Sequence, residues 1–510
     1  MNGFSALLQD AAARHGDRPA LVEGERSVRY GELPELLGRI ADSWQLPSTP
    51  RIALLLDNGV DAVLADLAGR WSAATVASIP PFFTPEQRSR ALEDLAPDLI
   101  LLPTAQAAVW PGEAKPCLGL ESTSALKTES HRSRLPQAES SSACISYTSG
   151  STGEPKGVAL DESLLLQVAG SLAAAVDGLG IRKHLAALPG ATLLEQVAGV
   201  YAPLLRGVTI ECCALKELGY DGASGLDPLR FVRRVARSKA QSVILVPQLL
   251  EALVGVLEHT GQRMGSLTFV AVGGARVSTS LLRRAERLGL PVFEGYGMTE
   301  CGSVLALNRV AAHRRGSVGR PLPHVQLRIA DDGEILVAGA GHGHALASPT
   351  AKTQEALDWW PTGDLGRLDD EGFLYIEGRR RNVFITAFGR NVSPEWVESE
   401  LCAEPAVSQA YVDGEALPAN VAVLVPQRAD CSDVQLDAAV AAANARLPSY
   451  ARVGAWLRAE PFSTTNGLLT GNGRPRRDAL RSRFDEAVRA LGLRQTLHPR
   501  VSPVQESVSA

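Results

Sequence analysis

The sequence predicts an α/β protein with a large N-terminal domain, in which helices flank parallel sheets, and a small α+β C-terminal domain. Strand-like apolar runs alternate with helical runs from residue 4 to about residue 294, which is the pattern of a parallel sheet. From residue 326 onward the pattern changes to short strands and turns. A chain of 510 residues is also too long for a single hydrophobic core.

The individual elements are predicted from hydrophobic periodicity and from short, continuous apolar runs. The predicted strands lie at 20–22, 27–30, 51–56, 75–79, 99–102, 143–147, 185–189, 208–210, 242–246, 269–272 and 291–294. The predicted helices lie at 4–15, 31–44, 59–71, 164–176, 193–205, 249–257, 280–288, 394–402 and 434–447. The polar, irregular stretch 103–142 is interpreted as a variable surface connection.

A run of cationic and polar residues, 379–382, interrupts the apolar pattern and marks the predicted domain boundary. The N-terminal domain is therefore expected at 1–378 and the C-terminal domain at 383–498. Residues 499–510 show no periodicity, and we expect a disordered tail there.

Composition excludes several functional classes. A net charge of −5 gives no sign of nucleic-acid binding or of a polybasic membrane anchor. No run of eighteen apolar residues and no apolar core near the N-terminus occurs, so neither an integral membrane segment nor a secretory signal is expected, although peripheral membrane contact stays possible. The seven cysteines are scattered without a Cys-x-x-Cys pair, which indicates neither a zinc site nor a disulfide framework and favours a cytoplasmic location.

The stretch Tyr147–Gly157 has the composition of a phosphate-binding loop. It contains three glycines, four hydroxyl residues and Lys156, and an apolar strand-like run precedes it. Glycines let the backbone approach an anion closely, and successive N–H groups and hydroxyls can then surround phosphate oxygens. The loop is not a Walker A motif, because Lys156 follows Pro155 and is itself followed by glycine. The alternative is a flexible surface loop, but such a loop has no need of the Pro-Lys-Gly ending.

The stretch resembles the phosphate-binding signature of the acyl-adenylate-forming superfamily, which contains acyl-CoA synthetases, adenylation domains of peptide synthetases and luciferases. Further motifs follow in the order of that family and extend the resemblance over residues 5 to 485. They are Gly273-Gly274-Ala275, Gly295-Tyr296-Gly297-Met298-Thr299-Glu300, Thr362-Gly363-Asp364, Gly378-Arg379, the segment 389–395 and the segment 470–474. In character the chain is closest to the fatty-acyl-CoA ligases of this family.

The resemblance implies a site for ATP and Mg²⁺. The phosphates would be held by Thr148, Ser149, Gly150, Ser151, Thr152, Gly153 and Lys156, and the nucleotide by Gly273, Gly274, Ala275, Gly295, Tyr296, Gly297, Asp364 and Arg379. Thr299 would contact the α-phosphate, and Glu300 would hold the metal. Gly389 would belong to a loop that lets pantetheine pass close to the backbone. The catalytic residues would be Lys156, Thr299, Glu300 and Arg474.

The resemblance also implies a two-step reaction. A carboxylic acid would react with ATP to give acyl-AMP and pyrophosphate, and a thiol would then displace AMP. The thiol would be that of CoA or of the phosphopantetheine on an acyl carrier protein. Between the steps the C-terminal domain would rotate as a lid about the hinge 379–382, centred on Arg381. A degraded member of the family that only binds nucleotide or acyl chain is the alternative outside the enzyme class.

Two departures from the family pattern bear on substrate and mechanism. Arg474 stands where the family has a catalytic lysine. In the segment 188–196, Thr192 and Gln196 replace the histidine and arginine of long-chain acyl-CoA synthetases. Amino-acid-activating members of the family carry an aspartate here that pairs with the ammonium group, and the segment 190–200 contains none. The resemblance therefore implies a carboxylic acid without an α-amino group, and a medium- or long-chain fatty acid is the predicted substrate. Leu193, Leu194, Val246 and Leu249 suit an apolar tunnel for it, and burial in the hydrophobic core is the alternative for each of them.

Overall fold

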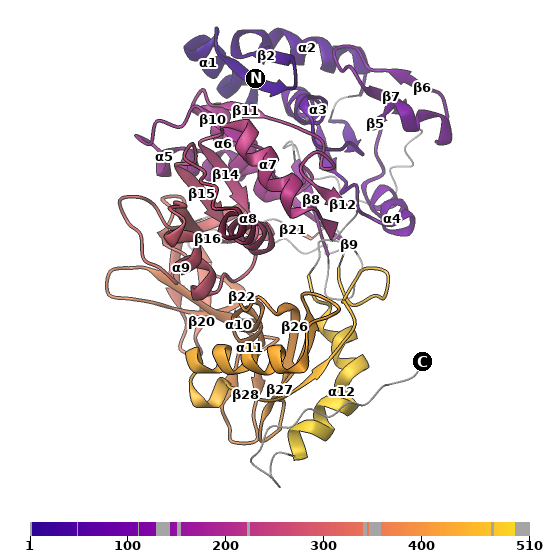
Figure 1. The fold of residues 1–510 in the computed structure, drawn as a ribbon. Coiled ribbons are helices and arrows are strands. Elements are labelled where there is room, and N and C mark those ends of the chain that lie inside the picture. The colour runs from indigo at the N-terminus through magenta and orange to yellow at the C-terminus, as the bar shows by residue number, and fades with distance from the viewer. Residues whose placement is uncertain are drawn as a thin grey trace.

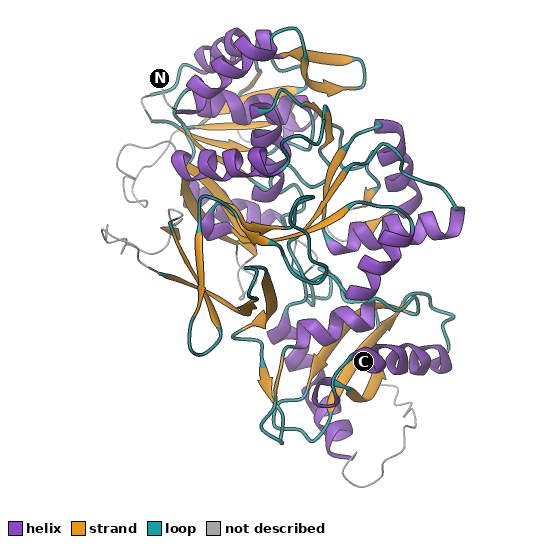
Figure 2. Ribbon diagram, turned by 90° about the vertical axis from the view of Figure 1, so that its left-hand side faces the viewer, coloured by secondary structure: helices purple, strands orange, loops and turns teal. Residues whose placement is uncertain are grey.

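The computed structural model describes residues 3–47, 49–110, 112–128, 143–149, 155–221, 225–339, 344–345, 359–470 and 474–494. Two large sheets with helices packed on them form the first part of the chain, and smaller sheets form the second (Figures 1 and 2). The predicted fold class is confirmed. Within the described residues no helix is both long and apolar enough to cross a membrane.

The larger sheet has nine strands in the order β18-β17-β16-β15-β14-β10-β11-β1-β2. Its centre, from β16 to β1, is parallel, whereas β2, β17 and β18 pair antiparallel at the two edges. The strands are β1 (Pro19–Glu23), β2 (Arg26–Arg29), β10 (Lys183–Leu185), β11 (Thr209–Glu211), β14 (Ser242–Leu245), β15 (Phe269–Val272), β16 (Val292–Met298), β17 (Ser303–Leu307) and β18 (Arg320–Pro321).

The second sheet has eight strands in the order β21-β9-β8-β4-β3-β5-β7-β6. Strands β8, β4, β3 and β5 are parallel, and antiparallel strands extend both sides. The strands are β3 (Arg51–Leu54), β4 (Thr75–Ser78), β5 (Leu99–Pro103), β6 (Ala114–Pro116), β7 (Thr123–Lys127), β8 (Ala143–Ser149), β9 (Pro155–Asp161) and β21 (His344–Ala345).

Helices connect and cover the strands of both sheets. The α-helices are α1 (Gly3–His15), α2 (Leu33–Trp44), α3 (Val60–Trp71), α4 (Pro85–Leu95), α5 (Glu162–Ala175), α6 (Ala202–Leu205), α7 (Pro228–Ser238), α8 (Pro247–Thr260) and α9 (Thr279–Arg287). Shorter turns are η1 (Tyr30–Glu32), η2 (Thr104–Val109), the π-helix η3 (Glu195–Tyr201) and η4 (Thr299–Cys301); β12 (Tyr220–Asp221) and β13 (Gly225–Leu226) form a small hairpin.

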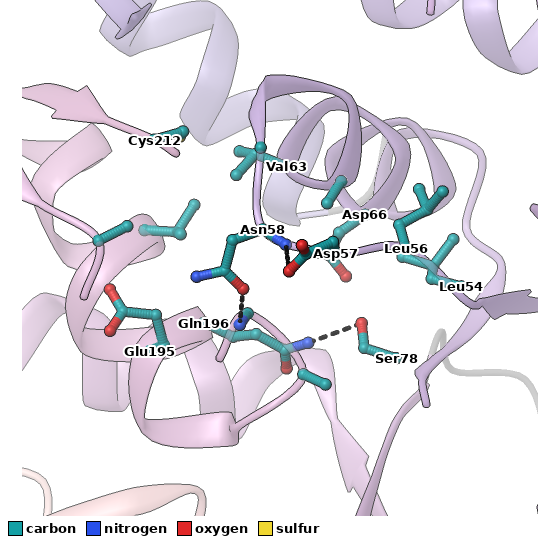
Figure 3. Close-up of a pocket in the computed structure, with 16 residues that line it drawn as sticks. Leu54, Leu56, Asp57, Asn58, Val63, Asp66, Ser78, Glu195, Gln196 and Cys212 are labelled. Carbon is teal, nitrogen blue, oxygen red and sulfur yellow. Dashed lines mark hydrogen bonds between the residues drawn. The ribbon is translucent and has the colours of Figure 1, made fainter. Parts of the chain in front are cut away.

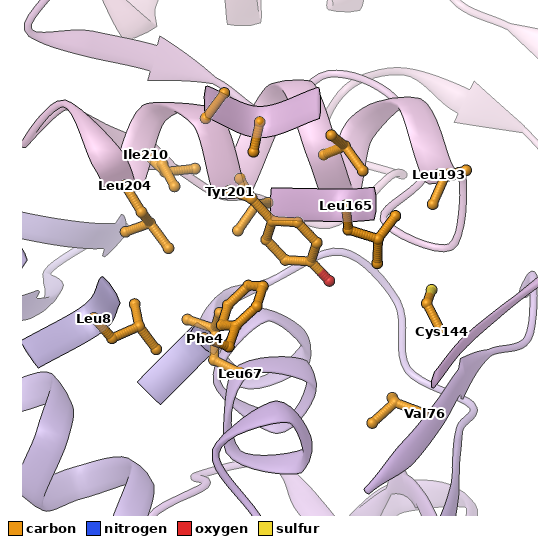
Figure 4. Close-up of a cluster of buried hydrophobic side chains, with 14 of the residues drawn as sticks. Phe4, Leu8, Leu67, Val76, Cys144, Leu165, Leu193, Tyr201, Leu204 and Ile210 are labelled. Atoms are coloured by element: carbon orange, nitrogen blue, oxygen red, sulfur yellow. The ribbon is translucent and has the colours of Figure 1, made fainter. Parts of the chain in front are cut away.

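A large hydrophobic cluster joins the two sheets. Phe4 and Leu8 of α1 pack with Tyr201, Leu204 and Ile210, which come from η3, α6 and β11 (Figure 4). The rings of Phe4 and Tyr201 meet edge to face, with their centroids 4.8 Å apart. The N-terminal helix is therefore part of the core that holds the two sheets together.

The structure corrects two predictions about elements and adds helices that were not predicted. The stretch 103–142 contains β6 and β7, and β7 pairs with β5 along five residues, so part of this stretch belongs to a sheet. The segment 193–205 is a π-helix followed by one turn of α-helix instead of a regular α-helix. Helices α4 and α7 were not predicted.

The last part of the chain folds into smaller sheets. A four-stranded sheet has the order β19-β20-β22-β23, a three-stranded sheet the order β26-β27-β28, and β24 and β25 form a hairpin. The elements are β19 (Gln326–Ile329), β20 (Glu334–Ala338), β22 (Trp360–Leu368), β23 (Leu374–Arg379), β24 (Phe384–Ile385), β25 (Asn391–Val392), α10 (Pro394–Cys402), β26 (Val407–Asp413), β27 (Asn420–Pro426), α11 (Asp433–Arg446), η5 (Ser449–Ala451), β28 (Val453–Arg458) and α12 (Arg477–Arg494).

Two hydrophobic clusters, one on each face of the three-stranded sheet, contain only residues after 383. This is the arrangement of a segment with a core of its own. The predicted helices at 394–402 and 434–447 are confirmed as α10 and α11. Helix α12 was not predicted, and the predicted tail 499–510 lies outside the described residues.

Candidate active site

The predicted phosphate-binding stretch begins in strand β8 and ends in strand β9. Strands β8 and β9 run antiparallel, and their register places Thr148 opposite Lys156 and Ser149 opposite Pro155. The side chain of Lys156 is exposed at this end of the hairpin. The predicted phosphate ligands Gly150, Ser151, Thr152 and Gly153 lie outside the described residues, as do the side chains of Thr148 and Ser149.

Strand β16 carries the second predicted motif towards the same region. Gly295, Tyr296 and Gly297 belong to β16, and Thr299 and Glu300 form the single turn η4 directly after it, both half-buried. A β-carbon on Gly297 would lie 1.7 Å from the carbonyl oxygen of Ser303, so only glycine fits against the neighbouring strand.

Asp364 is the centre of a buried polar cluster. Its Oδ2 accepts a hydrogen bond of 2.7 Å from the hydroxyl of Tyr296, and its Oδ1 lies 2.8 Å from Nε of Arg379. The register of β22 and β23 pairs Asp364 directly with Arg379, which explains the second contact. The structure thus brings together three predicted nucleotide-binding residues that are widely separated in the sequence.

Several neighbouring groups shift the pKa of Asp364. Burial raises the pKa of the Asp364 carboxyl, while Arg379 and the Tyr296 hydroxyl lower it and the carboxylates of Glu395 and Glu300 raise it further. Glu300, the predicted metal ligand, is therefore within electrostatic range of the cluster. A buried carboxylate of this kind can accept both hydroxyl protons of a ribose.

Arg474 reaches the same cluster from the C-terminal part of the chain. Its Nη2 donates a hydrogen bond of 3.0 Å to the carbonyl oxygen of Gly274, in the turn after β15. Desolvation by packed neighbours and the like charge of Arg379 lower the pKa of Arg474, although the residue as a whole is exposed, and Asp364 acts in the opposite direction. Arg474, the arginine predicted to stand in place of the family's lysine, thus lies beside the predicted nucleotide site.

The remaining predicted residues lie in two turns. Gly273, Gly274 and Ala275 follow the carboxyl end of β15, and Gly274 has a φ of +84°, which favours glycine. Gly389 lies in the turn of the β24–β25 hairpin with a φ of +69°. Among the described contacts none joins Gly389 to Asp364 or to Arg474.

A separate cavity of about 50 Å³ lies between the two large sheets. Asp57 and Asn58, after β3, face Glu195 and Gln196 of η3 across it, and Ser78 lies at its edge (Figure 3). None of the predicted ATP-binding residues that the structure describes lines this cavity.

Asn58, at the edge of this cavity, is a residue that sequence reasoning missed. Its side-chain amide donates to the carbonyl oxygen of Leu188 at 2.7 Å, and its Oδ1 accepts from the N–H of Gly190 at 2.6 Å. The amide thereby holds the start of the segment 188–196 from the other sheet. The sequence carries no signal for this contact, because it joins residues about 130 positions apart.

Comparison with known proteins assigns the chain to a family. The family described as "AMP-binding enzyme" matches residues 8–344, which is more than half of the chain. The chain belongs to this family. The predicted family and the predicted enzyme class, an AMP-forming acid–thiol ligase, are confirmed.

Individual relatives act on different acids. The 2-succinylbenzoate–CoA ligase of Bacillus velezensis is 28% identical over 425 residues, which are 79% of this chain and 83% of that protein. The long-chain-fatty-acid–CoA ligase FadD15 of Mycobacterium bovis is 40% identical over 156 residues, 30% of this chain and 26% of that protein. Both names describe CoA ligases, whereas a preference for fatty acids over aryl acids does not follow from them.

Solved structures agree on the fold. The o-succinylbenzoate CoA synthetase (MenE) of Bacillus subtilis, solved with the acyl-adenylate intermediate OSB-AMP, has a TM-score of 0.71 and 23% identity. The match covers 93% of this chain and 97% of that one. At this level of identity the likeness establishes the fold.

Proposed function

We propose that the protein activates a carboxylic acid with Mg·ATP and transfers the acyl group to CoA. The observation that carries this proposal is the cluster in which Tyr296, Asp364 and Arg379 meet next to Arg474. It supports nucleotide binding, because it offers a buried carboxylate for a ribose and a cation for the reacting phosphate beside it.

The reaction has two balanced steps. An oxygen of the substrate carboxylate attacks the α-phosphorus of ATP, the bond to the β-phosphate breaks, and pyrophosphate leaves. The sulfur of CoA then attacks the acyl carbon, the bond to the AMP oxygen breaks, and the thiol proton passes to solvent. Catalysis consists mainly of positioning and of neutralising phosphate charge.

Each proposed residue has a role that matches its chemistry. Lys156 binds the β- and γ-phosphates, and Arg474 bridges the substrate carboxylate and the α-phosphate. Thr299 donates to the α-phosphate. Asp364 accepts the ribose hydroxyls, and Arg379 holds that carboxylate in place.

Magnesium would be held by Glu300 together with phosphate oxygens and water. The described residues contain no group of three or more His, Cys, Asp or Glu side chains that could hold a metal alone. This fits Mg²⁺ in nucleotide enzymes, which usually keeps several waters and binds through one or two carboxylates. Bound there, the ion would neutralise charge on the phosphates.

We further propose that residues 383–498 form a lid that rotates about 379–382 between the two steps. The separate hydrophobic clusters of this segment support the proposal. Gly389 would line the path of the pantetheine arm after the rotation, when the β24–β25 hairpin reaches the site.

For the substrate we propose a medium- or long-chain fatty acid. Leu193 and Leu249 are buried in hydrophobic clusters, whereas Leu194 and Val246 are only partly buried and are the better candidates for an acyl-binding wall. An aryl acid is the second candidate, favoured by the length of the match to the 2-succinylbenzoate ligase. A carrier protein as thiol acceptor and a protein that only binds nucleotide are the further alternatives.

Pyrophosphate exchange across a panel of fatty, aryl and amino acids tests the proposal. We expect ATP–pyrophosphate exchange with fatty acids and thioester formation with free CoA. Exchange with amino acids alone would contradict the substrate class. If pyrophosphate exchange occurs but the thioester forms only on a carrier protein, the acceptor is the carrier protein and not CoA. If no acid supports exchange, the proposed enzymatic activity is contradicted.

A further inference from the structure

The turn after strand β15, residues 274–276, is one of the places where the proposed lid touches the large domain. Arg474 donates to the carbonyl oxygen of Gly274, as described above. Two residues on, the guanidinium of Arg276 lies over the ring of Trp396, with Cζ 5.6 Å from the ring centroid. Trp396 belongs to α10, the first helix of the lid, so the same short turn meets the lid at two points.

Arg276 also holds the strand that leads to the hinge. Its Nη1 donates a hydrogen bond of 2.9 Å to the carbonyl oxygen of Ile376 in β23, just before the proposed hinge at 379–382. A guanidinium is planar and has five donors, so it can stack on an aromatic ring and donate in its plane at the same time. The side chain of Arg276 therefore connects the turn 274–276 with strand β23 and with helix α10 of the proposed lid.

The surroundings of Arg276 are acidic. Desolvation by packed neighbours lowers the pKa of Arg276, although the residue as a whole is exposed, and four nearby carboxylates raise it. They come from α10 (Glu400 and Glu395), from β16 (Glu294) and from β23 (Glu377). Carboxylates on the lid and on the large domain thus both attract this cation, which favours the close approach of the two parts.

We propose that Arg276 is a positioning residue that holds the lid, through Trp396, in the pose in which Arg474 reaches the nucleotide site. The proposal rests on the proposed function and adds a residue to it. A rotation of the lid about 379–382 moves Trp396 away from Arg276, so the contact stabilises one of the two poses only. A contact with this property shifts the population towards the acyl-AMP-forming step.

The first test compares the two half-reactions in Arg276→Ala. Acyl-AMP formation, measured by pyrophosphate exchange with the acid found in the panel, should fall by about three- to thirtyfold, the range that such a stacking contact represents. Thioester formation from supplied acyl-AMP and CoA should be unchanged or faster. Equal loss of both steps would overturn the proposal, as would no change in either.

A matched control is available in the four-stranded sheet. Arg328 lies over the ring of Trp359 at 4.4 Å, the same type of contact outside the lid. Arg328→Ala should leave the ratio of the two half-reactions at the parent value. Trp396→Phe, which keeps an aromatic face for Arg276, should retain more acyl-AMP formation than Trp396→Leu, which keeps only apolar volume.

A second readout is independent of the substrate. Limited trypsin treatment, with fragments identified by mass, reports how accessible the arginines at 379–381 are. Arg276→Ala should speed cleavage there, whereas Arg328→Ala should not. If no acid supports exchange in the parent enzyme, the proposed function fails while this readout still decides the lid contact. Unchanged cleavage in Arg276→Ala would overturn the proposal.

Discussion

Arg474 is predicted to stand at the position of the family's catalytic lysine. An arginine keeps the positive charge of a lysine and can contact two oxygens at once, but it is larger and less compact. In the structure it already reaches the turn at Gly274 from the proposed lid. We therefore expect it to act in acyl-AMP formation and to be dispensable for thioester formation.

Arg474→Ala tests this role. Acyl-AMP formation should fall at least about tenfold, which corresponds to about 1.4 kcal/mol of transition-state stabilisation. Thioester formation from supplied acyl-AMP should stay near the parent rate, and Arg474→Lys should retain most of the first step. If Arg474→Ala forms acyl-AMP as fast as the parent, another cation must neutralise the reacting phosphate.

Glu294 is expected to make the free energy of unfolding depend on pH. It lies on β16 directly before the motif 295–300, and burial raises its pKa to about 7, against the opposing effects of the Gly316 N–H, Arg276 and Arg315. An unfolded glutamate ionises near pH 4.3. Between these values the folded state binds the extra proton, so the contribution of Glu294 to stability is fully present below the unfolded pKa and is lost as pH rises to about 7.

Glu294→Gln removes this titration while keeping an oxygen for the N–H of Gly316. Relative to the variant, the parent should lose roughly 1–3 kcal/mol of unfolding free energy between pH 5 and 8. Thermal unfolding of both proteins across this range measures the difference. An unfolding midpoint that changes with pH equally in both proteins would show that Glu294 does not titrate there.

Among the elements, the π-helix η3 departs from what periodicity predicted. A β-carbon on Gly199 in this helix would lie 2.0 Å from Oε1 of Glu195 and 3.1 Å from Nε2 of His184. These side chains are buried, so they have little room to move. Glycine is therefore required here by close packing.

Gly199→Ala should lower the free energy of unfolding by about 1–3 kcal/mol through overpacking. Gly170→Ala is the matched control, because Gly170 lies within α5 and a β-carbon there would meet nothing within 4 Å. That change should raise stability by about 0.5–1 kcal/mol, since alanine favours helix more than glycine does. Equal effects of the two substitutions on the thermal midpoint would contradict the packing argument.

Some elements were missed although the sequence carries their signals. Helix α4 begins with a capping box in which Thr84 and Gln87 each bond the other's backbone, and α7 begins with the N-cap Asp227 followed by proline. Strand β7, in contrast, has no such signal in the sequence. Thr123 is a buried polar residue that donates to the carboxylate of Asp61. Hydrophobic periodicity does not reveal a strand that has polar residues at buried positions.

For the whole molecule, the proposed rotation about 379–382 is the central mechanical expectation. Arg380 donates its N–H to the carbonyl oxygen of Gly363, and Asn382 donates to that of Arg379, so the backbone is held on both sides of Arg381. No backbone hydrogen bond from the N–H of Arg381 itself is described. A proline at 381 therefore changes mainly the torsional freedom of the backbone.

Arg381→Pro should fix φ at this position and restrict the preceding residue. In the pose of this structure Arg474 already reaches the nucleotide turn, so acyl-AMP formation should survive better than thioester formation. Single-turnover assays of each step separate the two effects. An equal loss of both steps, with unchanged thermal stability, would contradict the hinge assignment.

The sequence by itself determined the family, the fold class and most strands, because local signals carry them. Glycines, hydroxyls and a lysine at fixed spacing predict a phosphate-binding loop, and short apolar runs predict buried strands. The tertiary structure decided which residues meet. Asp364 and Arg379 face each other through strand register, and Asn58 holds Leu188 across two sheets. Arg276 reaches Trp396 in the same way, between parts of the chain that are distant in sequence. Such contacts depend on how the chain returns upon itself, and no local pattern of residues encodes that.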